Sequence, residues 1–237
     1  MIEKIAHKAV LIYPEFDTQT FTGIFSGGIT DELGLRLALK DSSSDGYMYN
    51  TMLDRDEASI DEQVLRLSAN WQPNDDLNVH AKIEHSEFEV TGSTSEYLGL
   101  MPLGPLAGFM AAAVIPAYDP KFETKTNHQR SSDGQETSDH QYTETDNFSL
   151  NIDYSIGAGI LTFVSGYSAY ESHDVLDSDY GPSPLLYTTG DDDFKQFSQE
   201  IRFVSQGNEK FDYITGVFYQ EQELQTNFNA HLSATPV

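Results

Sequence analysis

Alternation of apolar and polar residues is the feature of this sequence that most constrains its fold. From Leu33 to Leu39 every second residue is a leucine, and the residues between them are small or polar. Successive side chains of a β-strand point to opposite faces, so this pattern predicts a strand with one apolar face, whereas a helix would mix the two sets. The same alternation recurs at 65–71, 77–84 and 148–156. The chain is therefore predicted to form a sheet whose two faces differ in chemistry.

Further strands are indicated by segments rich in Thr, Val, Ile, Phe and Tyr. These segments lie near 18–29, 160–171, 195–205 and 211–225, with a weaker one near 8–16 that contains Pro14. Together with the alternating segments, they bring the expected total to about nine strands.

Short and long connections alternate between these strands. Turn-forming residues join strands at 30–32, 73–76, 157–159 and 206–210, and long polar loops are expected at about 41–63, 91–146 and 172–193. Bacterial transmembrane barrels have short turns at one end and long loops at the other, whereas a β-sandwich has no reason to separate them. Residues 1–237 are therefore predicted to form an all-β, antiparallel transmembrane β-barrel with meander connections. Since such single-chain barrels have an even number of strands, about nine strands imply a partial barrel that belongs to something larger.

Charge and composition exclude several classes of function. The chain has 13 Lys and Arg against 38 Asp and Glu, a formal net charge of −25. Too few cations remain to neutralise phosphates, so nucleic acid is not an expected partner. The absence of cysteine excludes disulfides, thiolate metal sites and thiol nucleophiles.

Several segments resemble the barrel of TonB-dependent outer-membrane receptors. The stretch Ile29–Ala38, followed by Ser44–Tyr47, is similar to the first strands of that barrel. Further similar segments are 65–77, 161–167, 197–203 and 213–220, and the match covers roughly residues 15–225. The order and spacing of these segments carry the resemblance.

The resemblance implies a plugged barrel in the outer membrane that imports a scarce nutrient. Siderophore-bound iron, cobalamin and oligosaccharides are the nutrients that such receptors take up, with energy from the TonB complex. The expected partners are outer-membrane lipid, the nutrient, and TonB by way of a plug. Because no plug domain, export signal, TonB-contacting segment or terminal aromatic strand is recognised, we expect an early part of the barrel that could not transport alone.

The polar face of the predicted strands supplies the candidate binding residues. On the barrel interpretation, the lumen-facing candidates are Arg36, Lys40, Arg66, Asn70, His80, Lys82, Glu84, Asn151, Asp153, Glu200 and Arg202. We expect most of them to bind water and the plug, and a minority to contact substrate. Residue chemistry alone does not choose among them.

No pattern for catalysis or for a cofactor is found, and the protein is not expected to be an enzyme. The acidic residues Asp174, Asp177, Asp179 and 191–193 are a possible cation site, but the other ligands of a calcium loop are missing. His128, His140 and His173 lack the short spacing that places two metal ligands on one helical face. We therefore predict solvated acidic loops and exposed histidines, with no catalytic residue, cofactor or metal site.

Two further interpretations depend on the structure. The uncharged segment 97–118 permits a short helix at about 106–115, which either folds over the barrel mouth or belongs to a loop that packs on itself. The alternative to a receptor is a soluble, secreted β-sandwich or barrel that binds carbohydrate or protein through its acidic loops.

Overall fold

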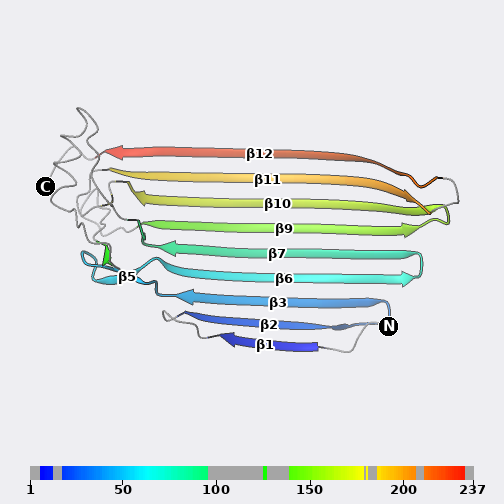
Figure 1. Ribbon diagram of the computed structural model, residues 1–237, viewed down its shortest axis with the longest axis horizontal. Helices are drawn as coiled ribbons and strands as arrows, with labels where there is room; N and C mark the ends of the chain where they lie inside the picture. Colours follow the sequence, from blue (N-terminus) through cyan, green and yellow to red (C-terminus); the bar gives the residue numbers. More distant parts are fainter. Residues whose placement is uncertain are drawn as a thin grey trace.

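The computed structural model contains strands as its only regular elements among the residues it describes (Figure 1). These residues are 18–95, 125–126, 139–178, 180, 186–206 and 211–232, together with the backbone of 6–12. The strands are β1 (Ala6–Ile12), β2 (Gln19–Gly28), β3 (Leu33–Ser44), β4 (Met48–Asn50), β5 (Arg55–Glu57), β6 (Ser59–Asn74), β7 (Leu77–Thr91), β8 (Lys125–Thr126), β9 (His140–Ser155), β10 (Gly159–Asp177), β11 (Leu186–Ser205) and β12 (Ile214–Leu232).

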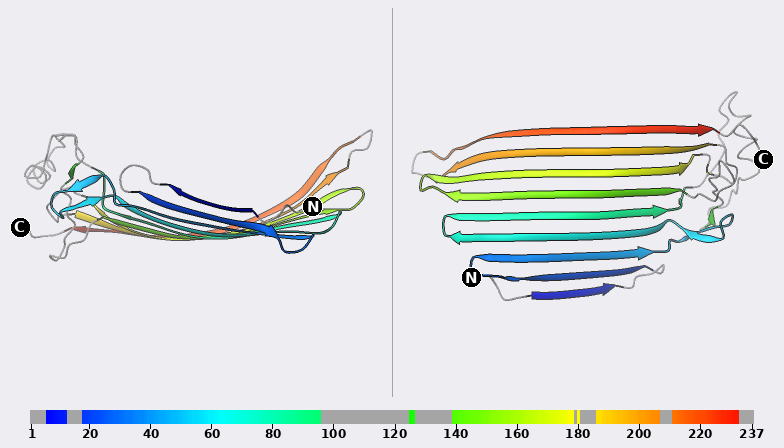
Figure 2. Two further views of the ribbon diagram at one scale, coloured as in Figure 1. Left: turned by 90° about the horizontal axis from the view of Figure 1, so that it is seen from below. Right: turned by 180° about the vertical axis from the view of Figure 1, so that it is seen from behind.

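Nine of these strands form one antiparallel sheet in the order β1-β2-β3-β6-β7-β9-β10-β11-β12. The predicted meander of about nine strands is confirmed, and each predicted strand overlaps one strand of this sheet. The sheet is a single curved layer whose two edges bend toward the same side (Figure 2). Within the described part of the chain, β1 and β12 form its two free edges. The sheet is therefore an open part of a barrel.

The two ends of the sheet differ as the sequence predicts. One end, the turn end, carries the tight β2–β3, β6–β7 and β9–β10 connections, and the long connections lie at the other, the loop end (Figure 1). Side-chain acceptors close two of these turns. Thr30 Oγ1 accepts the amide of Leu33 at 3.1 Å, and Asn74 Oδ1 accepts that of Leu77 at 2.9 Å. Such local bonds replace the backbone partners that the strands lose where the chain reverses.

Cross-strand register sorts the side chains into two faces. One row of directly paired residues is Leu33, Trp71, Val79, Ile152, Phe163, Ile201 and Val217, which crosses from β3 to β12. A parallel row nearer the loop end is Phe25, Leu37, Leu67, Ile83, Phe148, Tyr167 and Phe197. These rows and the residues between them on the same face form the apolar belt.

The apolar belt has no protein layer over it in the described part of the chain. Several of its large side chains are exposed, among them Ile201 at 37%, Ile83 at 51% and Val217 at 68%. The buried hydrophobic side chains among the described residues are only Met48 and Val175. So wide an exposed apolar surface is typical of a surface that contacts another protein or a membrane. The alternative β-sandwich, in which a second sheet would cover this face, is wrong.

The strands reach further toward the loop end than predicted, so the predicted loop boundaries are wrong. The loop expected at 41–63 shrinks to 45–58 and contains β4 and β5, and those expected at 91–146 and 172–193 shrink to 92–139 and 178–185. At the end of β3, residues 41–44 are polar on both faces, so the alternation of hydrophobicity disappears there while pairing with β6 continues to Ser44. Pairing, rather than hydrophobicity, sets the ends of these strands.

The predicted short helix at 106–115, with the rest of segment 97–118, lies outside the described residues. In the described part of the chain, no helix has the length and hydropathy needed to cross a membrane.

A second, three-stranded sheet of β5, β4 and β8 lies at the loop end (Figure 2). Its core is polar, because Asn50 and Glu57 are 0% and 1% exposed. Asn50 Oδ1 accepts the amides of Met52 and Leu53 at 2.9 and 3.1 Å. Arg55 pairs with Glu57 at 3.2 Å. Hydrogen bonds therefore hold this connection together alongside the packing of the buried Met48.

We expect a lysine in the belt to oppose membrane assembly. Leu37→Lys places a charge among lipid-facing side chains, at a cost of about 2–4 kcal/mol near the bilayer midplane. Ala38→Lys, one residue along the same strand, places the same charge on the opposite face and is the matched control. Folding into lipid vesicles, followed by the gel shift between folded and heated protein, should fall for Leu37→Lys alone. Equal folding of both variants would contradict the assignment of faces.

We expect Asn50→Ala to loosen the connection between β4 and β5. Two backbone amides lose their acceptor, at a cost of about 0.5–1.5 kcal/mol for each hydrogen bond. Hydrogen exchange at Met52 and Leu53 should become faster, while Asn50→Asp, which keeps an acceptor oxygen, should preserve most of the protection. Unchanged exchange in Asn50→Ala would show that these bonds do not hold the turn.

Candidate functional site

The register places all eleven candidate residues on the polar face, opposite the belt. Direct cross-strand pairs join several of them, such as Arg66 with Glu84 and Asn70 with His80. Their shared face follows from the strict period of two in each strand. Their role in binding remains a prediction.

Many of these candidates are paired with one another or with their neighbours. Lys40 Nζ lies 2.6 Å from Glu62 Oε2, and Arg66 forms an ion pair with Glu84. Arg202 pairs with Glu200 at 3.4 Å. The first two pairs join neighbouring strands, as opposite charges across a sheet do, whereas Arg202 and Glu200 both lie on β11.

Among the lysines and arginines of this set, Arg36 and Lys82 have no hydrogen-bond or ion-pair partner in the described residues. Arg36 pairs in register with Ser68, and Ser68 pairs with Lys82, so the two cations flank a serine in one cross-strand row. We call Arg36, Ser68 and Lys82 the cationic row. With strands about 4.8 Å apart, the Cα atoms of Arg36 and Lys82 are separated by two strand spacings, or about 10 Å. A guanidinium and an ammonium at this separation can bind one anionic group between them, with Ser68 as a further donor.

A buried acceptor lies close to the cationic row. Ser149, on β9, is the direct partner of Lys82, and Asn151 follows two residues later on the same face. The Oδ1 atom of Asn151 is buried and has no hydrogen-bond donor, while its Nδ2 lies 3.4 Å from Asp153 Oδ2. A buried amide oxygen without a donor costs free energy, so a donor from a bound group would be favourable at this point.

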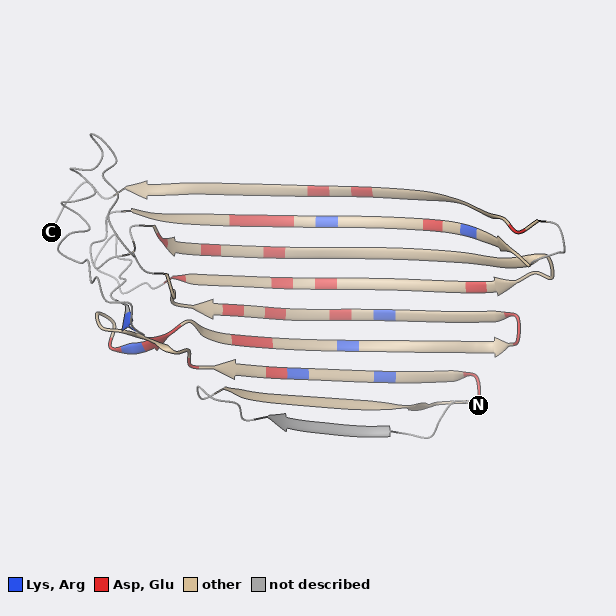
Figure 3. Cartoon of the chain, viewed as in Figure 1, with Lys and Arg blue, Asp and Glu red and all other residues tan. Residues whose placement is uncertain are grey.

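The distribution of cations on the sheet is uneven (Figure 3). On strands β2, β3, β6, β7, β9, β10, β11 and β12 of the large sheet, the Lys and Arg residues are Arg36, Lys40, Arg66, Lys82, Lys195 and Arg202, and of these only Lys195 lies on the belt face. Four of them come from the neighbouring strands β3, β6 and β7. A chain of net charge −25 therefore presents a cationic patch on one face. Such a patch attracts anions at short range.

Acidic side chains occupy the loop end of the same face. Asp174 on β10 and Asp192 on β11 point to the polar face, and Oδ1 of Asp174 is buried without a partner. Burial, followed by the charge of Asp192, raises the pKa of Asp174 above its ordinary value. The polar face is thus cationic in its middle and acidic toward the loops.

The acidic residues considered as a cation site in the sequence do not converge. Asp191 and Asp193 lie on the belt side of β11, Asp192 lies on the other side, and Asp177 is buried at the end of β10. Asp179 and His128 lie outside the described residues. Of the other two histidines, His140 contacts Glu89 at 2.9 Å and His173 contacts Asp191 at 2.6 Å.

Comparison with solved structures identifies the fold. The ferric yersiniabactin uptake receptor FyuA from Yersinia pestis aligns with a TM-score of 0.70 over 100% of this chain, at 15% sequence identity. The fold is that of a TonB-dependent receptor barrel. The ferric-catecholate import receptor Fiu from E. coli K12 aligns at 0.66 over 93% of the chain with 12% identity, and FpvAI in its complex with pyocin S2 at 0.57 over 97% with 10% identity.

This chain spans about a third of the length of these receptors, covering 33% of FyuA, 31% of Fiu and 28% of FpvAI. No protein-family model matches the sequence, and no characterised protein matches it at a significant level. The aligned structures, rather than a match in sequence, confirm the resemblance to TonB-dependent receptors at the level of the fold.

Sequence reasoning found both cations of the cationic row but not Ser68 between them. A small polar residue carries no distinctive pattern, and only the register of β3 against β6 and of β6 against β7 shows its position. The separation of paired from unpaired cations likewise required the structure.

We expect Asp174→Asn to stabilise the sheet at neutral pH. Because the folded-state pKa of Asp174 is raised, the folded protein binds the proton more tightly than the unfolded chain, and the wild type gains stability as pH falls. The stabilisation by Asn should therefore be present at pH 7 and disappear in acid. Thermal unfolding in detergent across this pH range measures it, with Asp75→Asn in the exposed β6–β7 turn as control. An equal effect of Asp75→Asn would contradict the assignment to Asp174.

Proposed function

We propose that this chain forms part of an outer-membrane receptor that binds a scarce nutrient and imports it with energy from the TonB complex. The observation that supports this most is the fold, a curved antiparallel sheet with a continuous apolar belt on one face and a polar opposite face. Two of the similar structures are named as uptake or import receptors for ferric compounds. In this proposal the chain binds its ligand without chemical change.

Outer-membrane lipid is the partner that the belt requires. Strands cross a bilayer only in a closed barrel, because every backbone amide and carbonyl must be paired in lipid. The described residues leave one edge of β1 and one of β12 unpaired. In the proposed receptor these edges pair with further strands of a larger barrel, which agrees with the threefold greater length of the similar receptors.

The cationic row favours an anionic ligand within this class. Arg36 and Lys82 have no partner among the described residues, and charge-assisted hydrogen bonds to carboxylate or catecholate oxygens are stronger than bonds to neutral hydroxyls. A negatively charged ferric chelate therefore fits this face better than a neutral oligosaccharide. The plug that the fold implies would compete for the same row through its own carboxylates.

We expect the charges of the cationic row to be needed for uptake. In cells that lack the gene, complementation with the Arg36→Gln/Lys82→Gln variant should reduce uptake of a radiolabelled ferric chelate at least about tenfold, since each charge-assisted contact contributes about 1.5–3 kcal/mol. Lys195→Gln removes a cation from the belt face and is the matched control. Outer-membrane fractions should contain equal amounts of both variants.

Two results would count against the proposal. Recovery of the wild-type protein in the soluble fraction would exclude an outer-membrane receptor. Full uptake by the double variant, at equal amounts in the membrane, would exclude the cationic row as a binding element.

A further inference from the structure

Four residues of types that bind metals form a square on the belt face, just beyond the belt toward the loop end. His85 and Glu87 lie on β7, and Asp146 and Glu144 lie on β9. His85 is directly opposite Asp146, and Glu87 is directly opposite Glu144. We call these residues the His85 square. Ile83 and Phe148, one step nearer the turn end, belong to the belt, so the square begins where the belt stops.

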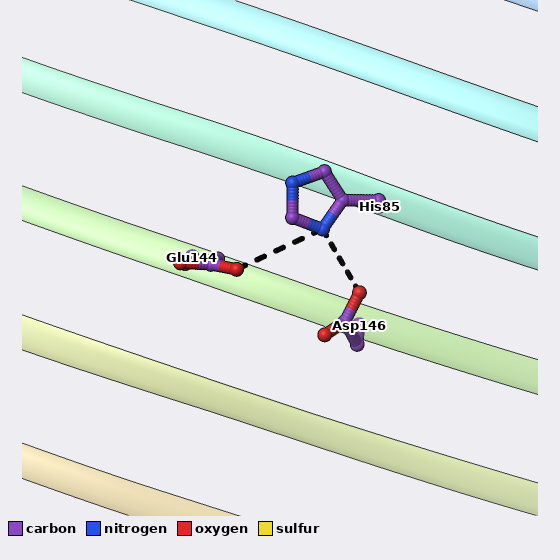
Figure 4. A group of neighbouring side chains, drawn as sticks. All are labelled: His85, Glu144 and Asp146. Atoms are coloured by element: carbon purple, nitrogen blue, oxygen red, sulfur yellow. Dashed lines mark hydrogen bonds and ion pairs between the residues drawn. The ribbon is translucent and has the colours of Figure 1, made fainter.

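One nitrogen of His85 faces two carboxylates (Figure 4). Its Nδ1 lies 2.9 Å from Asp146 Oδ1 and 3.9 Å from Glu144 Oε1, and the three donor groups lie within 4.8 Å of one another. Ligand atoms around a tetrahedral zinc ion with bonds of 2.0–2.2 Å are separated by about 3.4 Å. The observed distances lie on both sides of this value. Small side-chain rotations are therefore enough to close the three groups around an ion.

The other ring nitrogen of His85 has a partner of its own. Nε2 lies 3.4 Å from Glu87 Oε1. A histidine that binds a metal through one nitrogen usually donates its second N–H to a carboxylate, which fixes the tautomer and orients the ring. When Nε2–H donates to Glu87, Nδ1 is left with a lone pair that points at Glu144 and Asp146. The contact between Nε2 and Glu87 is a separate observation from the three-donor geometry, and it too favours a metal ion bound at Nδ1.

The charges around the square favour a bound cation. A row of directly paired residues contains Asp41, Gln63, Glu87, Glu144, Glu171 and Asp193. Like charges directly opposite each other destabilise a sheet. On this face, β7, β9 and β10 carry no Lys or Arg along their described lengths, and Lys195 on β11 is paired with Asp193 at 3.0 Å. A divalent ion at the square would relieve this repulsion.

We propose that His85, Glu144 and Asp146 bind a divalent transition-metal ion of the zinc class, with Glu87 as the positioning residue for His85. The imidazole favours zinc and its neighbours in the series over magnesium or calcium, which prefer oxygen ligands alone. A hollow of about 410 Å³ lined in part by His85 and Glu87 gives solvent access to the site. Water completes the coordination. The site lies on the face opposite the cationic row, so it does not depend on the proposed function.

The test uses Zn²⁺ alone, and then Co²⁺ as a spectroscopic probe, with the full chain in detergent micelles. Calorimetry should show one Zn²⁺ per chain, and Co²⁺ should give the visible absorption of a site with mixed nitrogen and oxygen ligands. Glu144→Gln and Asp146→Asn should each weaken binding at least about tenfold. Glu87→Ala should weaken it about 10–100-fold, as other changes to groups that orient a metal ligand do.

The controls separate this site from general attraction of cations to acids. His173 forms a histidine–carboxylate pair with Asp191 on the same face, but these two residues belong to no group of three metal-binding side chains in the described part of the chain. His173→Ala should therefore leave Zn²⁺ affinity unchanged. The Gln and Asn variants keep side-chain shape and remove repulsion, so they should fold. Equal losses in His85→Ala and His173→Ala, or full binding in Glu144→Gln and Asp146→Asn together, would overturn the proposal.

Discussion

Cross-strand register is the constraint on which the rest of this structure depends. Side chains alternate with a period of two, so a slip of one residue between β3 and β6 would move every leucine of the belt to the polar face. The pairing of Leu37 with Leu67 and of Ala38 with Arg66 belongs to one register. The same register also sets the cationic row and the His85 square. A change of register would therefore disrupt the apolar belt, the cationic row and the His85 square at the same time.

The belt explains why the chain has so little apolar interior. Only Met48 and Val175 are buried hydrophobic residues in the described part of the chain, so apolar burial within the protein contributes little to its stability. In the proposed receptor, the belt leaves water when the barrel enters the bilayer, and the hydrophobic effect acts at that step. Backbone pairing along strands of up to 20 residues then satisfies the polar groups. Polar cores such as that around Asn50 and Glu57 occur beyond the belt, where water is available during folding.

The strands are predictable from the sequence because one face of the sheet is apolar and the other polar, so hydrophobicity alternates along each strand. The signal at Leu33–Leu39 ended with the belt, and so the polar continuation of β3 to Ser44 was assigned to a loop. The eleven polar-face residues were found by the same alternation, but their pairing was not, because it depends on neighbouring strands. The His85 square was missed for a related reason. Its two halves lie on strands separated by the long connection 92–139, and no local spacing joins them.

The uneven distribution of charge limits how the proposed receptor can attract an anionic ligand. Asp174 and Asp192 lie at the loop end of the polar face, and the acidic row around Glu87 lies at the loop end of the other. An anion that approaches from the loops therefore meets repulsion first and reaches the cationic row only at short range. Long-range steering, which accelerates association for complementary charges, is absent on this route. Affinity must then come from contacts with Arg36 and Lys82. Added salt screens both the repulsion at the loop end and the attraction of these cations, so it should increase the rate of entry and decrease the strength of binding.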